Sequence, residues 1–132
     1  MEVLNYLKEI DKNLKQEKNE IWVKVKKEKL KRVLEKLRNL GVSRISSISG
    51  VDVGKKIEII YHFIYNENII NIRTSVPKEN PEISTIIEIY PGANLFEREL
   101  AEMLGVKVLG HPNPKRLFLP EDWKGKPPLR KD

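Results

Sequence analysis

The chain has 132 residues, of which 39% are hydrophobic and 33% charged, and this is the composition of one soluble globular domain. It contains no cysteine and only two histidines, His62 and His111. These counts exclude iron–sulfur clusters, thiolate zinc sites and cysteine nucleophiles, and they argue against a histidine-based metal site or relay. The sequence therefore predicts a chain that carries no cofactor of its own.

The formal net charge of +6 is unevenly distributed. Residues 1–40 carry a net charge of +5, residues 41–106 carry −3 and residues 107–132 carry +4. Basic ends thus flank an acidic middle. The basic ends indicate either binding to the acidic surface of a partner or a lysine-rich helix face that is simply solvated.

Nothing in the sequence predicts a membrane span or a signal peptide. The apolar stretch at residues 57–64 is interrupted by Glu58 and His62 and is shorter than the ~20 residues that cross a bilayer. The first eleven residues include Glu2, Glu9 and Asp11, unlike the basic start of a signal peptide. We therefore expect a cytoplasmic chain.

The first forty residues predict a helix, a strand and a second helix. Apolar residues at helical spacing mark a helix over residues 3–14, and alternation at residues 21–25 marks a strand with one buried face. Helical spacing returns at residues 30–40, and Gly41 stands where a helix C-cap favours glycine.

The middle of the chain predicts a β-hairpin. Residues 42–53 indicate only an irregular strand followed by a turn, whereas residues 57–65 alternate clearly between two faces. A turn at residues 66–68 leads to a return strand at 69–76, which should end at Pro77. Residues 83–89 fit a helical turn or a short strand.

A third helix is predicted from Asn94 to the glycine at position 105. Asn94 is the expected N-cap and Glu97 its capping-box partner, while Glu102 lies at ion-pairing spacing from Arg98. Residues 112–132 are rich in proline and predict an extended tail.

Two groups of residues invite a functional interpretation. Tyr61, Phe63 and Tyr65 alternate along one strand as in RNA-stacking sheets, but Ile57 and Ile59 continue the same face, so core packing is favoured. The acidic residues near Glu97 could form a catalytic pair, yet capping and salt bridging explain them more simply.

Several short motifs occur in a fixed order near the C-terminus. They are Glu97-Arg98-Glu99, Glu102-Met103-Leu104-Gly105, Gly110-His111-Pro112 and Lys115-Arg116-Leu117, preceded by Tyr90-Pro91-Gly92 and followed by Leu119-Pro120-Glu121-Asp122-Trp123. This order resembles the C subunit of the respiratory NADH-quinone oxidoreductase, complex I, and the related component of membrane-bound energy-converting nickel–iron hydrogenases.

The resemblance implies a cofactor-free, non-catalytic subunit of an oxidoreductase complex. Its partners would be the large catalytic subunit, which it would dock onto and stabilise, and a neighbouring iron–sulfur subunit, with membrane contact only through the complex. Because the longer C-terminal continuation of quinone-reducing members is absent after Asp132, the resemblance favours the hydrogenase branch. The composition, rich in Lys, Ile, Glu and Asn, suits a thermophile.

The resemblance also assigns docking rather than turnover to the signature residues. These are Glu97, Arg98, Glu99, Glu102, His111, Pro112 and Arg116, to which we add Trp123, Arg130 and Lys131 in the tail. Trp123 is the expected apolar anchor, while Arg116, Arg130 and Lys131 would pair with acidic groups. The alternative is a tail that wraps its own domain.

Together these patterns predict an α+β fold in which helices pack on a mixed, mostly antiparallel sheet of about four strands. Residues 1–109 would form the domain and residues 110–132 its extended docking tail, with Tyr61, Phe63 and Leu34 in the core. The alternative function is a small basic nucleic-acid-binding module that uses the basic ends.

Overall fold

A computed structural model describes residues 2–112 and 125–131 of the chain. At its centre is a five-stranded sheet with the order β1-β2-β5-β4-β3. The strands are β1 (Lys15–Glu17), β2 (Glu20–Lys24), β3 (Arg44–Asp52), β4 (Lys56–Tyr65) and β5 (Asn68–Pro77). Only β2 and β5 pair in parallel, so the sheet is mixed and mostly antiparallel, as predicted.

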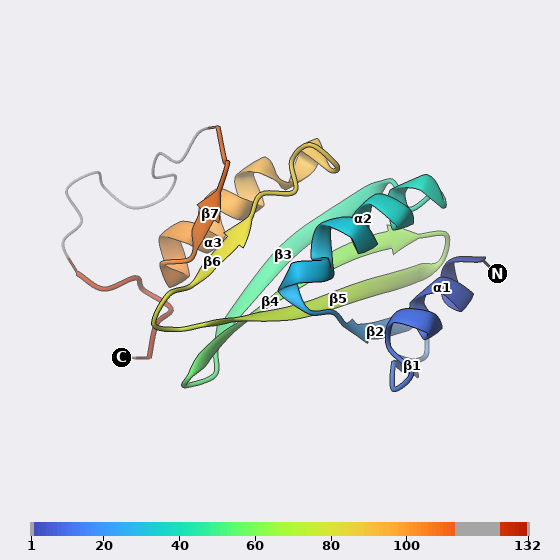
Figure 1. The fold of residues 1–132 in the computed structure, drawn as a ribbon, viewed down its shortest axis with the longest axis horizontal. Helices are drawn as coiled ribbons and strands as arrows, with labels where there is room; N and C mark the ends of the chain where they lie inside the picture. The colour runs from blue at the N-terminus through green and yellow to red at the C-terminus, as the bar shows by residue number, and fades with distance from the viewer. Residues whose placement is uncertain (1, 113–124, 132) are drawn as a thin grey trace.

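Helices pack against this sheet to give the predicted α+β fold (Figure 1). The helices are α1 (Glu2–Ile10), η1 (Lys27–Lys29), α2 (Leu30–Asn39), η2 (Pro91–Ala93) and α3 (Asn94–Leu104). Helix α2 crosses the sheet, whereas α1 contacts β2 and α3 contacts β3 (Figure 1). Helices α1 and α3 thus lie toward opposite edges of the sheet.

The hairpin of β4 and β5 confirms the clearest sequence pattern. The two strands pair from Lys56 opposite Pro77 to Tyr65 opposite Asn68, and Asn66 in the turn has a φ of 54°. Asparagine tolerates this left-handed conformation better than most residues. Gly41, with a φ of 106°, likewise follows the end of α2, as predicted.

The predicted core residues are buried. Tyr61 is 1% exposed, and Phe63 and Leu34 are 0% exposed. The Phe63 ring lies 4.9 Å from that of Tyr90, whose hydroxyl donates to the Val42 carbonyl at 2.6 Å. Because Tyr61 and Phe63 face the helices, neither can stack on bases from solvent, and their interpretation as core residues is confirmed.

Several elements differ from the sequence-based expectations. The first helix ends at Ile10, where the Asp11 carboxylate accepts the N–H groups of Asn13 and Lys24 and turns the chain toward β2. Strand β3 has nine residues, with a register irregularity between Ile45 and Ser47 that hides its alternation.

Three short strands were not assigned from the sequence, although a short strand was one of the two alternatives for residues 83–89. They are β1 and the parallel pair of β6 (Glu82–Ser84) and β7 (Lys107–Leu109), which forms a separate two-stranded sheet. Each has three residues, too few for a periodic pattern to develop. Strand β7 shows that regular structure continues to Leu109.

Candidate docking surface around helix α3

The start of α3 differs from the predicted capping box. Pro91 begins the short helix η2, which leads directly into α3, so Ala93 occupies the N-cap position and no side-chain cap forms. The buried Oδ1 of Asn94 has no hydrogen-bond partner within the described residues. The capping-box assignment of Asn94 and Glu97 is therefore wrong.

Glu97 is instead a buried acceptor, 1% exposed. It lies on the same face of α3 as Leu100 and Leu104 because spacings of three and four residues bring side chains together. Its Oε1 accepts the Thr85 hydroxyl at 2.5 Å and its Oε2 accepts the Ile86 N–H at 2.9 Å. Glu97 thereby fixes the segment that follows β6.

Burial raises the pKa of Glu97, because the charged carboxylate is poorly solvated there, and the bonds from Thr85 and Ile86 only partly oppose this. His111 lies beside this carboxylate: its Nε2 is 3.9 Å from Oε1, and both side chains are 2% exposed. Nε2 also lies 3.2 Å from the Asn94 carbonyl, which can only accept, so Nε2 carries a proton. The first turn of α3 thus holds His111 in place.

The other signature residues within the described chain lie on or near the same helix. Arg98 and Glu99 are half-buried, Glu102 is buried, and Pro112 is exposed. The ion pair expected between Arg98 and Glu102 stays a prediction.

The described end of the chain binds the C-terminus of α3. Gly105 ends the helix with a φ of 72°. The Leu129 N–H donates to the Met103 carbonyl at 2.8 Å, and Arg130 Nε donates to the Leu104 carbonyl at 2.7 Å. These carbonyls have no partner inside the helix, and a guanidinium is favourable at the negative end of the helix dipole.

Asp52, the last residue of β3, binds the same terminal segment and was missed by the sequence analysis. Its Oδ2 accepts the Lys131 N–H at 2.7 Å and lies 2.8 Å from Lys78 Nζ, and its Oδ1 accepts the Gly54 N–H at 2.9 Å. The hydrogen bond from Lys78, and then those from Lys131 and Gly54, hold the pKa of Asp52 far below its usual value. Only the local Asp-Val-Gly turn was visible in the sequence.

Of the four tail residues predicted to anchor or pair with a partner, the structure describes two. Arg130 and Lys131 contact their own domain, through Leu104 and Asp52, as in the alternative of a tail that wraps the domain. Arg116 and Trp123 lie outside the described residues.

Three leucines on or beside α3 and β7 are exposed. Leu95 of α3 is 53% exposed, Leu109 of β7 is 43% exposed, and Leu129 beside the end of α3 is 57% exposed. Sequence periodicity did not single them out, because isolated surface leucines are common.

A row of polar side chains crosses the face of the sheet away from Tyr61, and it too was missed. His62 Nε2 is 2.8 Å from Ser49 Oγ, and its Nδ1 is 2.6 Å from Asn71 Oδ1. Asn71 Nδ2 donates to Glu20 Oε1 at 3.3 Å. The four residues come from four neighbouring strands, so only the folded sheet brings them together.

The described residues contain no group of three or more His, Asp or Glu side chains placed to hold a metal ion. Among residues 2–112 and 125–131, no helix has the length and apolarity that crossing a bilayer requires.

A family model and similar curated proteins point to the same protein family. A model described as "Respiratory-chain NADH dehydrogenase, 30 Kd subunit" matches residues 23–132. The C subunit of the F420H2 dehydrogenase of Methanosarcina mazei is 36% identical over 113 residues, which cover 82% of this chain and 72% of that protein. The C subunit of the NADH-quinone oxidoreductase of Roseiflexus castenholzii is 39% identical over 93 residues, covering 67% of this chain and 53% of that protein.

Two solved structures share the fold. A chain of the membrane-bound sulfane sulfur reductase, an archaeal respiratory membrane complex, superposes with a TM-score of 0.85 at 23% identity, over 98% of this chain and 82% of that chain. The trypsin-resistant fragment (1–134) of Nqo5 superposes with a TM-score of 0.73 at 21% identity, over 85% of this chain and 96% of that chain.

Proposed function

The chain belongs to the family of the 30-kDa subunit of respiratory-chain NADH dehydrogenase, and we propose that it docks onto and stabilises the large catalytic subunit of such a membrane-bound redox complex. The complex would be of the complex I type or an energy-converting hydrogenase. In this proposal the chain is a non-catalytic subunit, peripheral on the cytoplasmic face, and a neighbouring iron–sulfur subunit is its second partner.

The observation that carries the proposal is the exposure of Leu95, Leu109 and Leu129 around α3. They belong to three segments that contact one another, since β7 packs on α3 and the Leu129 N–H binds Met103. Large apolar side chains that stay exposed on neighbouring segments support a protein–protein contact in this region. The motif residues Glu97, Arg98, Glu99 and Glu102 lie on α3 as well.

The geometry at the two ends of α3 supports a docking role for the tail. His111 is held at the first turn through Asn94, and Arg130 is held at the last turn through Leu104. We propose that Trp123, between these two anchors in sequence, is the apolar contact with the large subunit and that Arg116 pairs with its acidic groups. Arg130 and Lys131 would contribute by keeping the end of the tail in register with α3.

The experiment that tests this proposal is the substitution Trp123→Ala. The purified variant should melt within about 2 °C of the wild type, because its anchor contacts the partner rather than the core. Its recovery with the large subunit should fall, since loss of an aromatic hot spot costs about 2 kcal/mol, or roughly thirtyfold in affinity.

Trp22→Ala is the matched control, because Trp22 is a half-buried tryptophan of β2, far in sequence from α3 and the tail. It should leave the recovery of the complex unchanged, whatever its effect on the melting temperature. A Trp123→Ala variant that unfolds, or that assembles as well as the wild type, would contradict the docking role.

A further inference from the structure

On the edge that faces β2, strand β5 is paired along only part of its length. Its pairing with β4 runs from Asn68 to Pro77, whereas its pairing with β2 runs only from Ile69 to Arg73. The last bond on this edge joins the Val25 N–H to the Arg73 carbonyl at 2.8 Å. Beyond that bond the chain leaves the sheet and enters η1.

The backbone of Ser75 faces the uncovered part of the edge. Consecutive residues of a strand direct their N–H and C=O groups to opposite edges. Since the Arg73 carbonyl points toward β2, the N–H and C=O of Ser75 point to the same side. No strand in the described part of the chain pairs with Ser75 there.

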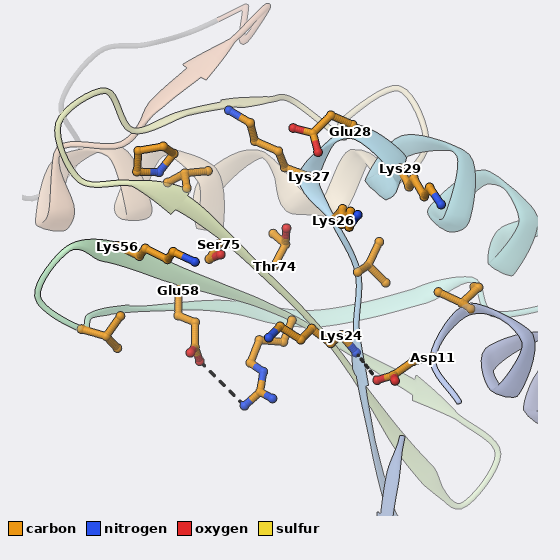
Figure 2. A pocket seen from close by; sticks show the side chains of 16 residues that line it. Asp11, Lys24, Lys26, Lys27, Glu28, Lys29, Lys56, Glu58, Thr74 and Ser75 are labelled. Atoms are coloured by element: carbon orange, nitrogen blue, oxygen red, sulfur yellow. Dashed lines mark hydrogen bonds and ion pairs between the residues drawn. The ribbon is translucent and has the colours of Figure 1, made fainter. Parts of the chain in front are cut away.

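A groove of about 740 Å³ runs along this edge, between the end of β5 and the segment that leads from β2 into η1 (Figure 2). Its rim is strongly basic. Five exposed lysines line it, and none forms an ion pair within the described residues: Lys24, Lys26, Lys27, Lys29 and Lys56.

The acidic residues of the groove are partly engaged. Glu58 lies 4.0 Å from Arg73, and the Asp11 carboxylate accepts the Lys24 N–H at 2.9 Å (Figure 2). The groove therefore presents an excess of positive charge beside unpaired strand backbone.

Thr74 adds an unsatisfied polar group to the wall of the groove. It is 2% exposed, and its Oγ1 has no hydrogen-bond partner within the described residues. A buried hydroxyl without a partner costs free energy that a bound polar group can recover.

We propose that this basic groove binds an extended acidic peptide segment, which adds to the edge of β5 at Ser75 and places its carboxylates against the lysines. Main-chain hydrogen bonds would supply affinity, and the lysines would select acidic side chains. The proposal rests on the proposed function only in naming a neighbouring subunit as the source of the segment.

A peptide fits the groove better than a nucleic acid does. The strand edge offers N–H and C=O groups at the spacing of another extended backbone, and none of the described residues that line the groove is aromatic and able to stack on bases. The carboxylates of Asp11, Glu28 and Glu58 would also lie close to a phosphate backbone.

The test uses the full 132-residue chain and a fluorescent nine-residue probe that alternates threonine and glutamate. Fluorescence anisotropy should show saturable binding that weakens as salt is added. The double variant Lys26→Glu/Lys56→Glu should weaken binding about tenfold or more, because rim charges steer and select the partner. The matched control Lys15→Glu/Lys31→Glu makes the same charge change at exposed lysines outside the groove and should bind as the wild type.

A second variant tests strand addition separately from charge. Ser75→Pro removes an N–H that points into the groove and leaves the ladder with β4 intact, so its melting temperature should stay close to that of the wild type while probe binding falls. A probe methylated on alternate amides should lose affinity as well.

Equal binding of a threonine–lysine probe, equal loss in both double variants, or tighter binding of a mixed single-stranded RNA would each overturn the proposal. A chain that binds the acidic probe but does not assemble with the large subunit would contradict the proposed function alone. A chain that assembles with the large subunit but does not bind the acidic probe would contradict only the proposal that the groove binds a peptide.

Discussion

The carboxylate of Asp52 accepts a hydrogen bond from the backbone N–H of Lys131 at 2.7 Å, although the two residues are 79 positions apart in sequence. The same carboxylate lies 2.8 Å from Lys78 Nζ with its side chain 0% exposed. One buried acid thus joins the end of β3, the loop after β5 and the end of the chain.

Replacing Asp52 with asparagine should release the terminal segment. The amide keeps one acceptor oxygen but loses the charge that holds Lys78, so the segment at residues 125–131 should open more often. Hydrogen exchange of the Lys131 amide should accelerate by about tenfold, while the β4 and β5 amides keep their protection. An unchanged exchange rate at Lys131 would show that Asp52 does not anchor the segment.

Acid should weaken the same anchor in the wild type. The pKa of Asp52 is lowered by its bonds to Lys78, Lys131 and Gly54, so its contribution to stability is present above the unfolded-state pKa of about 3.9 and is lost as the pH falls through the lower folded-state value. The difference in free energy of unfolding between wild type and Asp52→Asn should therefore shrink as the pH falls from about 5 to about 2. Urea titrations at several pH values measure it, and a constant difference would contradict the assignment.

Glu97 should respond differently to its two simplest substitutions. Glu97→Ala leaves the buried Ile86 N–H and the Thr85 hydroxyl without their acceptor, which should cost about 1–3 kcal/mol. Glu97→Gln should cost less, because its oxygen can accept from Ile86 and its amide can donate to the Thr85 hydroxyl, which also accepts. Equal losses in the two variants, measured by urea denaturation, would argue against this hydrogen-bonding role.

The pH dependence of Glu97→Gln provides an independent check. Because burial raises the pKa of Glu97, the folded wild type binds a proton more tightly than the unfolded chain and loses stability as the pH rises above about 4.3. The glutamine variant lacks this loss, so its stability relative to the wild type should rise between about pH 4 and pH 7.

Gly50 should tolerate only a small side chain. A Cβ at this position of β3 would lie 2.3 Å from Leu104 Cδ1 and 2.6 Å from Leu100 Cδ1, both of which are flexible side-chain ends. Gly50→Ala can be accommodated by shifts of those methyl groups, whereas Gly50→Val should push α3 away and cost about 1–3 kcal/mol. Thermal unfolding measures the difference in stability between the two variants, and equal melting temperatures would contradict this close contact.

The sequence predicted best where a pattern repeats over many residues. The ten-residue strands β4 and β5 and the amphipathic α2 were all visible in this way. Glu97 was misassigned because the proline-initiated η2 places the N-cap of α3 at Ala93 rather than Asn94, and Glu97, interpreted as a cap, lies on the buried face. The spacing from Glu97 to Leu100 and Leu104 was the available signal.

Other features were beyond reach because they depend on distant parts of the chain. Asp52 meets Lys131 only after the sheet and the terminal segment have folded together, and nothing near Asp52 in sequence indicates that contact. The row from Ser49 to Glu20 likewise needs four strands in register. The basic groove exists because the pairing of β2 with β5 ends at Arg73, four residues before β5 itself ends at Pro77. The sequence of either strand alone does not indicate where their pairing ends.

The contact between Asp52 and Lys131 also orders events during synthesis. Chains emerge from the ribosome at about 5–20 residues per second, N-terminus first, so Lys131, 79 positions after Asp52, is the last of its donors to be synthesised. The β3–β5 meander and α3 can form earlier, with the carbonyls of Met103 and Leu104 still open to water. Until Lys131 has emerged, Asp52 therefore lacks one of its three hydrogen-bond donors and the C-terminal end of α3 lacks the bonds from Leu129 and Arg130.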